Sequence, residues 1–408
     1  MKKLLVLVLF LSGVVLADNA ASGTTSAQRW PWNGKVDISY TLTATTTKTT
    51  PVFSVKFFCE DPETNRFELT TITGDGATGI TLGAGQKKTT WDAAADLGTD
   101  VDTAGYKIGV YAEDVTDAAT YLVLDLTTYK MTTSLTGPSV AEGASSKYAE
   151  LWFRRIENGT FVMGSATTEP GRNSRREAEH TVTLSKAYYI GVFELTEGQY
   201  SRIDYNPSTW QYAVSAWPQV EISYNTLRGT SYGATWPSKN DHRVDSDSFF
   251  GKLRTKTGNG LIFDLPTEAQ WEAAARWKGT TGNGTNDYHG SSVWNNGVTF
   301  DSSYSGIDDV AWHSDNSGDA TQEVGLKAPS TIGTYDMHGN AWECCLDWYV
   351  QDITSYVNDP EGPASGTARL TRGGCYYNGA LNCRIAYRVG YVPSYVTLGS
   401  GCRVALVP

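Results

Sequence analysis

Apolar and polar residues alternate through the first third of this 408-residue chain, a pattern that suits strands and leaves no room for amphipathic helices. Threonine- and glycine-rich turns separate the alternating segments. Three segments place on one face Val36, Ile38, Tyr40 and Leu42, then Phe53, Val55, Phe57 and Cys59, and then Tyr106, Ile108, Val110 and Ala112. The alternation predicts a small antiparallel β-sandwich over residues 18–135.

The rest of the chain shows little regular periodicity. Residues 136–147 are small and polar and include glycine and proline, which is typical of a linker. Residues 148–408 contain long tracts rich in Gly, Asn, Ser, Asp and Trp. The clearest helix follows Thr267, which forms a capping-box pattern with Gln270, and a second helix begins near Thr196. We therefore expect an α+β chain whose C-terminal domain is largely irregular.

The N-terminus has the layout of a secretory signal peptide. Two lysines precede an apolar run from Leu4 to Leu16, and the small residue Ala17 follows. The run is shorter than the roughly 20 residues that a membrane-spanning helix needs. We expect residues 1–17 to be cleaved as a signal peptide, and the mature protein to be secreted, periplasmic or held at the cell surface without spanning the membrane.

The charge balance is acidic, with 44 Asp and Glu against 33 Lys and Arg and a formal net charge of −11. Nucleic acid and anionic membrane surfaces repel such a chain, so we expect neither as a partner. The same acidity is compatible with bound divalent cations. Five of the six cysteines fall in the last 65 residues, where they either form disulfides or take part in thiol chemistry.

Eight blocks of sequence, in order, resemble the formylglycine-generating-enzyme, or sulfatase-modifying-factor, family. The blocks include GTYDMHGNAWECCLDWY and RLTRGGCYYNGALNCRIAYR, and the resemblance covers about 250 residues. They are residues 161–165, 180–200, 206–210, 217–224, 265–276, 333–349, 359–388 and 401–406. The resemblance implies a variant of the C-type lectin fold for residues 148–408. Members of the family oxidise a sulfatase cysteine with copper, act in other oxidative pathways or bind ligands, so the site and not the fold decides the function.

The copper site of the family is incomplete in this sequence. In the active oxidases two cysteines bind copper(I) as thiolates, which soft copper(I) requires. Here Asn378 stands at the position of the first cysteine, Cys383 at the second, and Cys375 at a preceding serine. An amide oxygen replaces sulfur poorly as a copper(I) ligand. The resemblance therefore implies lost oxidase chemistry, with Cys383 as the catalytic candidate if any activity persists.

The resemblance also implies a disulfide and a calcium site. Family members with a cysteine in the block that contains Cys345 often carry one at Cys383, which implies a Cys345–Cys383 disulfide, while the pairing of Cys344, Cys375 and Cys402 stays open. The YDMHGNAWE block matches a calcium-binding segment of the family. Its ligands would be the carboxylates of Asp336 and Glu343 and the backbone carbonyls of Gly339 and Ala341, an oxygen set that suits Ca²⁺.

Tyrosines mixed with small and polar residues fill the last 35 residues, a composition typical of adaptable binding surfaces. The candidate ligand-binding residues are Tyr376, Tyr377, Asn378, Leu381, Tyr387, Tyr391 and Tyr395. The arrangement also resembles the variable region of proteins that retroelements diversify.

Three hypotheses for the function remain open. The leading hypothesis is a secreted, non-catalytic protein that binds a protein or glycan ligand through this surface. The alternative is a copper-dependent formylglycine-generating oxidase that acts on sulfatase cysteines. An oxidoreductase with another metal is a third hypothesis, for which the sequence offers no ligand set.

Overall fold

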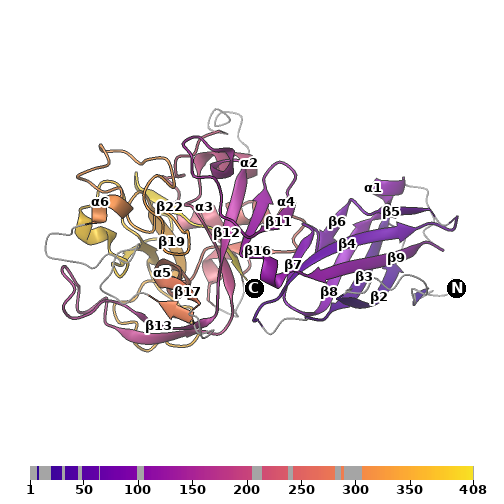
Figure 1. Cartoon of the computed structure of the whole chain (residues 1–408), viewed down its shortest axis with the longest axis horizontal. Helices are drawn as coiled ribbons and strands as arrows, with labels where there is room; N and C mark the ends of the chain where they lie inside the picture. Colours follow the sequence, from indigo (N-terminus) through magenta and orange to yellow (C-terminus); the bar gives the residue numbers. More distant parts are fainter. Residues whose placement is uncertain are drawn as a thin grey trace.

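The computed structural model describes residues 7–8, 20–29, 33–44, 48–63, 65–98, 105–204, 214–237, 242–280, 286–288 and 306–407. The molecule is elongated, with a β-rich N-terminal domain at one end and a larger C-terminal domain at the other (Figure 1). The expected signal peptide, residues 1–17, and its cleavage site lie outside the described residues, apart from Leu7 and Val8. These two residues form the short strand β1 (Leu7–Val8).

Two antiparallel sheets build the N-terminal domain, as the alternation predicts. The spatial order of the first sheet is β1, β2 (Ala21–Gln28), β3 (Lys35–Leu42), β8 (Gly85–Asp92) and β6 (Ile72–Gly74). In the second sheet, β4 (Val52–Glu60) pairs with β5 (Arg66–Glu68), β7 (Ile80–Leu82) and β9 (Lys107–Asp114). A short helix, α1 (Ala93–Leu97), follows β8.

The apolar faces predicted on these strands meet in one core. All four residues named on β3 and all four named on β4 are buried, as are Ile108, Val110 and Ala112 of β9. Trp91 of β8 is fully buried among them. Because successive side chains of a strand point to opposite faces, the period-two pattern was sufficient to identify the inward residues.

The boundary between the domains differs from the expected one at residue 135. Strands β10 (Tyr121–Asp125) and β11 (Met131–Ser134) do not join the sandwich, because β10 pairs with β12 (Glu150–Ile156) of the C-terminal domain. They extend a six-stranded sheet in the order β11-β10-β12-β15-β23-β16. The sandwich strands therefore end with β9, at Asp114. Alternation identifies a strand but does not say which sheet it joins, and that is why the sequence misplaced this boundary.

Residues 136–147, the expected linker, lie against the C-terminal domain. The ammonium group of Lys147 is fully buried and forms an ion pair of 2.6 Å with Glu323, which also accepts a hydrogen bond from the amide of Gly143. The side chain of Val140 packs beside Phe193 and Val324. These contacts fix the segment in place, although its composition is that of a flexible linker.

The remaining strands of the C-terminal domain form one large sheet and three small ones. The large sheet also contains β15 (Tyr188–Gly191), β16 (Ile262–Asp264) and β23 (Ala405–Val407). The small sheets are the pair β13 (Gly159–Met163) and β14 (His180–Leu184), the pair β17 (Trp277–Thr280) and β18 (Asn286–Tyr288), and a four-stranded sheet of β21 (Val389–Tyr391), β20 (Arg369–Arg372), β19 (Trp342–Trp348) and β22 (Ser400–Cys402).

The described helices of the C-terminal domain are short, and all except α6 begin at a Ser or Thr cap. They are α2 (Glu197–Ile203), α3 (Tyr224–Arg228), α4 (Phe249–Lys256), α5 (Glu268–Arg276) and α6 (Ile307–Val310). The predicted capping box of Thr267 with Gln270 begins α5, and the helix predicted near Thr196 begins with a second capping box, formed by Thr196 and Gln199. No helix in the described part of the chain is long and apolar enough to cross a membrane. The structure confirms the predicted α+β class.

The two domains share packed contacts. Val52, Ile80 and Leu82 of the sandwich belong to the same hydrophobic cluster as Leu122 and Leu253 of the C-terminal part. At this junction the amide of Gly74 donates to the carbonyl of Gly258 at 2.6 Å. A Cβ on Gly260 would lie 2.0 Å from the carbonyl oxygen of Gly74, so only glycine permits this approach.

Candidate functional site

The predicted tyrosine residues lie between β20 and β22, on the connection formed by residues 373–399. Two ring pairs organise it: Tyr391 stacks on Tyr395 with centroids 5.2 Å apart, and Tyr376 meets Tyr377 edge to face at 5.0 Å. Tyr377 is 39% exposed and Tyr395 is 49% exposed. Because each exposed ring packs on a neighbouring ring, little side-chain entropy is lost when a ligand covers this surface.

The structure divides the predicted ligand-binding residues into exposed and packed ones. Tyr377, Leu381 and Tyr395 are exposed, Asn378 and Tyr391 are half-buried, and Tyr376 is buried. Tyr387 is half-buried and packs beside Trp342 at 6.0 Å. The sequence analysis selected tyrosines and missed the exposed aliphatic residues between them, which are Val392, Val396 and Leu398. We define the tyrosine surface as the half-buried Tyr391 together with six exposed residues, which are Tyr377, Leu381, Val392, Tyr395, Val396 and Leu398.

Asn378, at the position of the first catalytic cysteine of the family, has a structural role. Its Oδ1 accepts hydrogen bonds from the amide of Cys375 at 3.1 Å and from the Cys375 thiol at 2.9 Å. Burial raises the pKa of the Cys375 thiol to about 12 and holds the pKa of Cys383 well above its ordinary value. Both sulfurs are therefore protonated thiols at neutral pH, and neither is a ready thiolate ligand.

The predicted Cys345–Cys383 disulfide is absent. All six cysteines lie in the described part of the chain, and all six are free thiols. Cys345 is buried on β19 in the cluster around Trp271 of α5, whereas Cys383 belongs to a separate cluster with Val310 of α6. The order of the sequence blocks could not show that the two thiols are buried in different hydrophobic clusters. Cys344 lies opposite Cys402 in the parallel pairing of β19 and β22.

The predicted calcium ligands lie in the buried loop before β19, apart from Glu343, which is on β19 itself. Asp336, Gly339, Ala341 and Glu343 are buried, and Asp336 and Gly339 have positive φ values of 57° and 71°. One oxygen of Asp336 accepts from the amide of Gly325 at 2.7 Å. The other, Oδ1, is buried and has no hydrogen-bond partner within the described residues. An unpartnered buried carboxylate oxygen is costly, so a bound cation would suit this position.

Glu194 is a member of this loop cluster that the sequence analysis missed. Its carboxylate accepts from the amide of Ala341 at 2.8 Å and from the side-chain amide of Asn340 at 2.6 Å. Burial and the neighbouring carboxylate of Asp336 hold the pKa of Glu194 well above its ordinary value. The signal in the sequence was a single acid inside the otherwise apolar run YYIGVFEL.

The electrostatics of the cluster are compatible with a divalent cation. Three buried carboxylates, Glu194, Asp336 and Glu343, face one buried guanidinium, Arg403, which forms an ion pair with Glu343. Burial raises the pKa of Asp336 to about 6. The described residues contain no group of three or more His, Cys, Asp or Glu side chains that could hold a metal.

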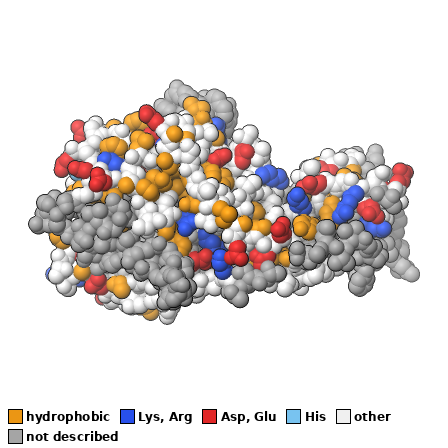
Figure 2. Space-filling model, in the orientation of Figure 1, with side chains coloured by type: hydrophobic (Ala, Val, Ile, Leu, Met, Phe, Trp, Pro, Cys, Tyr) orange, Lys and Arg blue, Asp and Glu red, His pale blue; other side chains and the backbone are white. Residues whose placement is uncertain are grey.

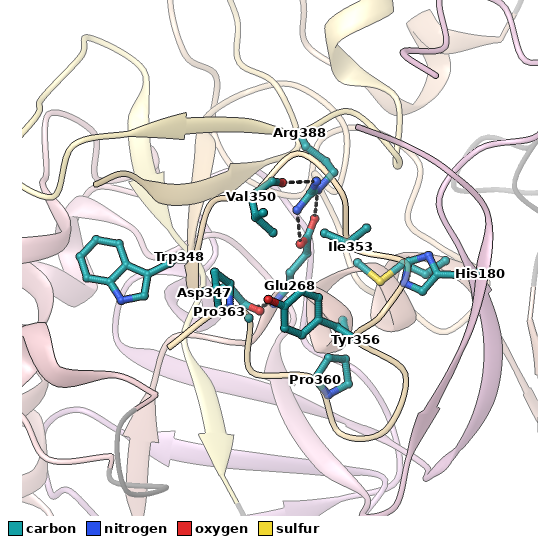
Figure 3. A pocket seen from close by; sticks show the side chains of 13 residues that line it. His180, Glu268, Asp347, Trp348, Val350, Ile353, Tyr356, Pro360, Pro363 and Arg388 are labelled. Atoms are coloured by element: carbon teal, nitrogen blue, oxygen red, sulfur yellow. Dashed lines mark hydrogen bonds and ion pairs between the residues drawn. The ribbon is translucent and has the colours of Figure 1, made fainter. Parts of the chain in front are cut away.

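A separate pocket of about 290 Å³ lies between β14, α5 and the segment that follows β19 (Figure 3). In Figure 3, Arg388 faces Glu268, the ring of Tyr356 lies beside Asp347, and His180 stands on the far side. The Asp347 carboxylate accepts from the amide of Glu268 at 2.7 Å and so caps the first turn of α5. None of the predicted ligand-binding or metal residues lines this pocket. The carboxylate of Glu268 pairs with Arg388, and that of Asp347 caps α5. We therefore infer that these residues stabilise the fold and do not bind a ligand.

The fold and this site define a domain of the sulfatase-modifying-factor class. Residues 152–407 match the family described as the sulfatase-modifying factor enzyme 1-like domain. The chain belongs to this family, as the resemblance of its sequence blocks implied.

Several known proteins are similar to parts of the chain. The formylglycine-generating enzyme of Thermomonospora curvata is 33% identical over 162 residues, which are 35% of this chain and 49% of that enzyme. The serine/threonine-protein kinase pkn1 of Chlamydia caviae is 32% identical over 267 residues, 61% of this chain and 37% of the kinase. The chain thus spans half or less of these two relatives. The structure of Treponema denticola variable protein 1 superposes with a TM-score of 0.48 and 26% identity, covering 67% of this chain and 99% of that one.

Proposed function

We propose that this chain is an exported, non-catalytic protein that binds a protein or glycan ligand through the tyrosine surface. The hydrogen bonding of Asn378 carries this proposal, because its amide occupies the position of a copper-binding thiolate and is already engaged by Cys375. The second sulfur, Cys383, is fully buried. A buried thiol without a partner thiolate is a poor copper(I) site.

The alternative oxidase function predicts a product that can be measured. We expect a sulfatase peptide with the C-x-P-x-R motif to keep its mass when incubated with the purified protein, copper(I), oxygen and a thiol reductant. The formylglycine-generating enzyme of Thermomonospora curvata serves as the positive control on the same peptide. A decrease in mass at the peptide cysteine that is abolished by Cys383→Ser would instead show an active oxidase, and the proposal would be wrong.

We further propose that Ca²⁺ is held by Asp336, Glu343 and the carbonyls of Gly339 and Ala341. The buried, unpartnered Oδ1 of Asp336 and the excess of buried carboxylates support it. In this position calcium would hold the loop before β19 in place and would have no role in a reaction step.

Calcium removal tests this site. At a free calcium concentration about ten times the dissociation constant, binding to the folded state adds about 1.4 kcal/mol to the free energy of unfolding. We expect the melting temperature to fall on chelation and to recover with calcium, and metal analysis to find about one equivalent. Asp336→Ala removes this response, whereas Asp352→Ala at an exposed position keeps it. Less than half an equivalent in the parent protein after mild dialysis would contradict the proposal.

Export and diversification are separate proposals with their own tests. A mature N-terminus at Asp18 would support export through residues 1–17. A near-repeat of the 3′ end of the gene, altered at adenines and lying beside a reverse transcriptase gene, would support diversification of the tyrosine surface by a retroelement. Absence of that repeat would remove diversification and leave ligand binding untouched.

A further inference from the structure

Two further segments border the tyrosine surface. The amide of Asn225 donates to the carbonyl of Pro393, and the amide of Ile222 donates to the carbonyl of Ser400. On the other side, the amide of Ser314 donates to the carbonyl of Asn378 at 2.9 Å. Residues 214–226 and residues 306–326 therefore frame the segment 373–402, far apart in sequence but in contact in the fold. Helix α6, at the start of residues 306–326, lies at the end of the molecule opposite the sandwich (Figure 1).

The charges that these three segments expose are all negative. Their exposed acids are Glu221, Asp308, Asp309, Asp315 and Asp319, and the side chains of Asp308 and Asp315 are 74% and 81% exposed. Figure 2 shows acidic side chains beside hydrophobic ones at this end of the C-terminal domain.

The basic residues of the same segments are buried. Among residues 214–226, 306–326 and 373–402, all of them described, the only Lys or Arg residues are Arg384 and Arg388. Arg384 is paired with Glu169 and Glu177, and Arg388 is paired with Glu268, all inside the protein. His313 is buried, with Nε2 2.7 Å from Asp308. No Lys or Arg within these ranges offsets the exposed acids. Just outside them, Lys327 donates to the carbonyl of Asp308 and interacts with Asp308 and Asp309, and Gly171, next to Arg172, lies against Leu381. The acids tested below are therefore Glu221, Asp315 and Asp319.

Exposed aromatic faces bordered by carboxylates are suited to lysine and arginine side chains. A guanidinium stacks on a tyrosine ring and pairs with a carboxylate through the same planar group. Aliphatic stems of lysine and arginine also cover apolar surface, which Val392, Val396 and Leu398 provide here. The net charge of −11 attracts such a ligand from a distance.

We infer that the tyrosine surface recognises a polypeptide segment rich in arginine or lysine. The inference rests on the proposed ligand-binding function and names the ligand class of that same surface. A neutral glycan could donate hydroxyl hydrogen bonds to the exposed carboxylates but would gain no charge pairing, and an acidic ligand would be repelled by them.

Selection from a phage-displayed library of random 12-residue peptides tests the inference with a defined probe. The immobilised protein is compared with three variants: the acid variant Glu221→Gln/Asp315→Asn/Asp319→Asn, the aromatic variant Tyr377→Ala/Tyr395→Ala, and a control. The control, Glu63→Gln/Glu68→Gln/Glu113→Gln, removes the same three charges from exposed positions of the sandwich.

We expect enriched peptides with a net positive charge. Their affinity should fall about tenfold in the acid variant, fall at least as much in the aromatic variant, and stay within about twofold in the control. Higher salt should weaken binding to the parent protein and to the control, but weaken binding to the acid variant less.

The outcomes separate the inference from the proposed function. Suppose that the enriched peptides are neutral or acidic, that their affinity falls in the aromatic variant, and that it is unchanged in the acid variant. This result would support ligand binding and overturn the cationic ligand class. Enriched peptides that bind the aromatic variant unchanged would overturn both. If no peptide is enriched, the cationic class is overturned, and the same aromatic variant on a glycan array then tests the proposed function.

Discussion

Replacing Arg403 with alanine is expected to lower the free energy of unfolding by about 3–5 kcal/mol, because it leaves a buried carboxylate without its partner. The guanidinium lies fully buried beneath the loop before β19 and binds both oxygens of Glu343, at 2.5 and 2.9 Å. It also donates to the carbonyls of Gly191 and Val192, each at 3.0 Å. The same substitution would also remove a buried positive charge that interacts with Glu194 and Asp336.

Thermal unfolding followed by near-ultraviolet circular dichroism measures this effect. The matched control is Arg29→Ala in the exposed pair with Asp37, where both side chains are more than 40% accessible. Solvent and salt screen an exposed pair of this kind, so the melting temperature should hardly change. An Arg403→Ala protein that unfolds within about 1 kcal/mol of the parent would contradict the role given to this pair.

Replacing Asp347 with asparagine is expected to stabilise the protein at pH 8 relative to the parent, and to have little such effect at pH 4. Burial and the neighbouring carboxylate of Glu268 raise the pKa of Asp347 to about 7. Between about pH 4 and pH 7 the folded state keeps a proton that the unfolded chain has lost, so stability falls as the pH rises. The amide stays neutral and keeps an oxygen for the amide of Glu268, and therefore avoids that loss.

The size of this effect follows from the pKa shift. A shift of this extent corresponds to on the order of 2–4 kcal/mol above pH 7. Urea unfolding of parent and variant at pH 4, 6 and 8 measures the difference between the two proteins at each pH. Asp309→Asn makes the same atomic change at an exposed position of α6 and should shift stability equally at all three values. A constant difference for Asp347→Asn would show that its carboxyl ionises normally in the folded state.

The sequence predicted the elements that depend on local pattern. The buried faces of β3 and β4 follow from alternation, and α5 begins where Thr267 and Gln270 form their capping box. The family resemblance selected Asp336 and Gly339, which are buried in the loop before β19, and their role as calcium ligands stays a prediction. These features are encoded within a few neighbouring residues, so a single sequence is enough to identify them.

The sequence analysis failed where the answer depends on distant partners. It assigned β10 and β11 to the sandwich, although both extend the sheet of the C-terminal domain. It paired Cys345 with Cys383, although the two thiols are buried in different clusters. It also passed over Glu194, whose partners Asn340 and Ala341 lie almost 150 residues further along the chain.

The sequence by itself determined the strand faces, the helix starts and the family, because each depends on residue type and short-range spacing. Only the tertiary structure decided which sheet each strand joins, which carboxylates share a buried cluster, and which acids frame the tyrosine surface. Segments 214–226 and 306–326 border that surface through backbone hydrogen bonds to residues 373–402. Contacts between segments so far apart depend on how the whole chain packs, and no local pattern encodes them.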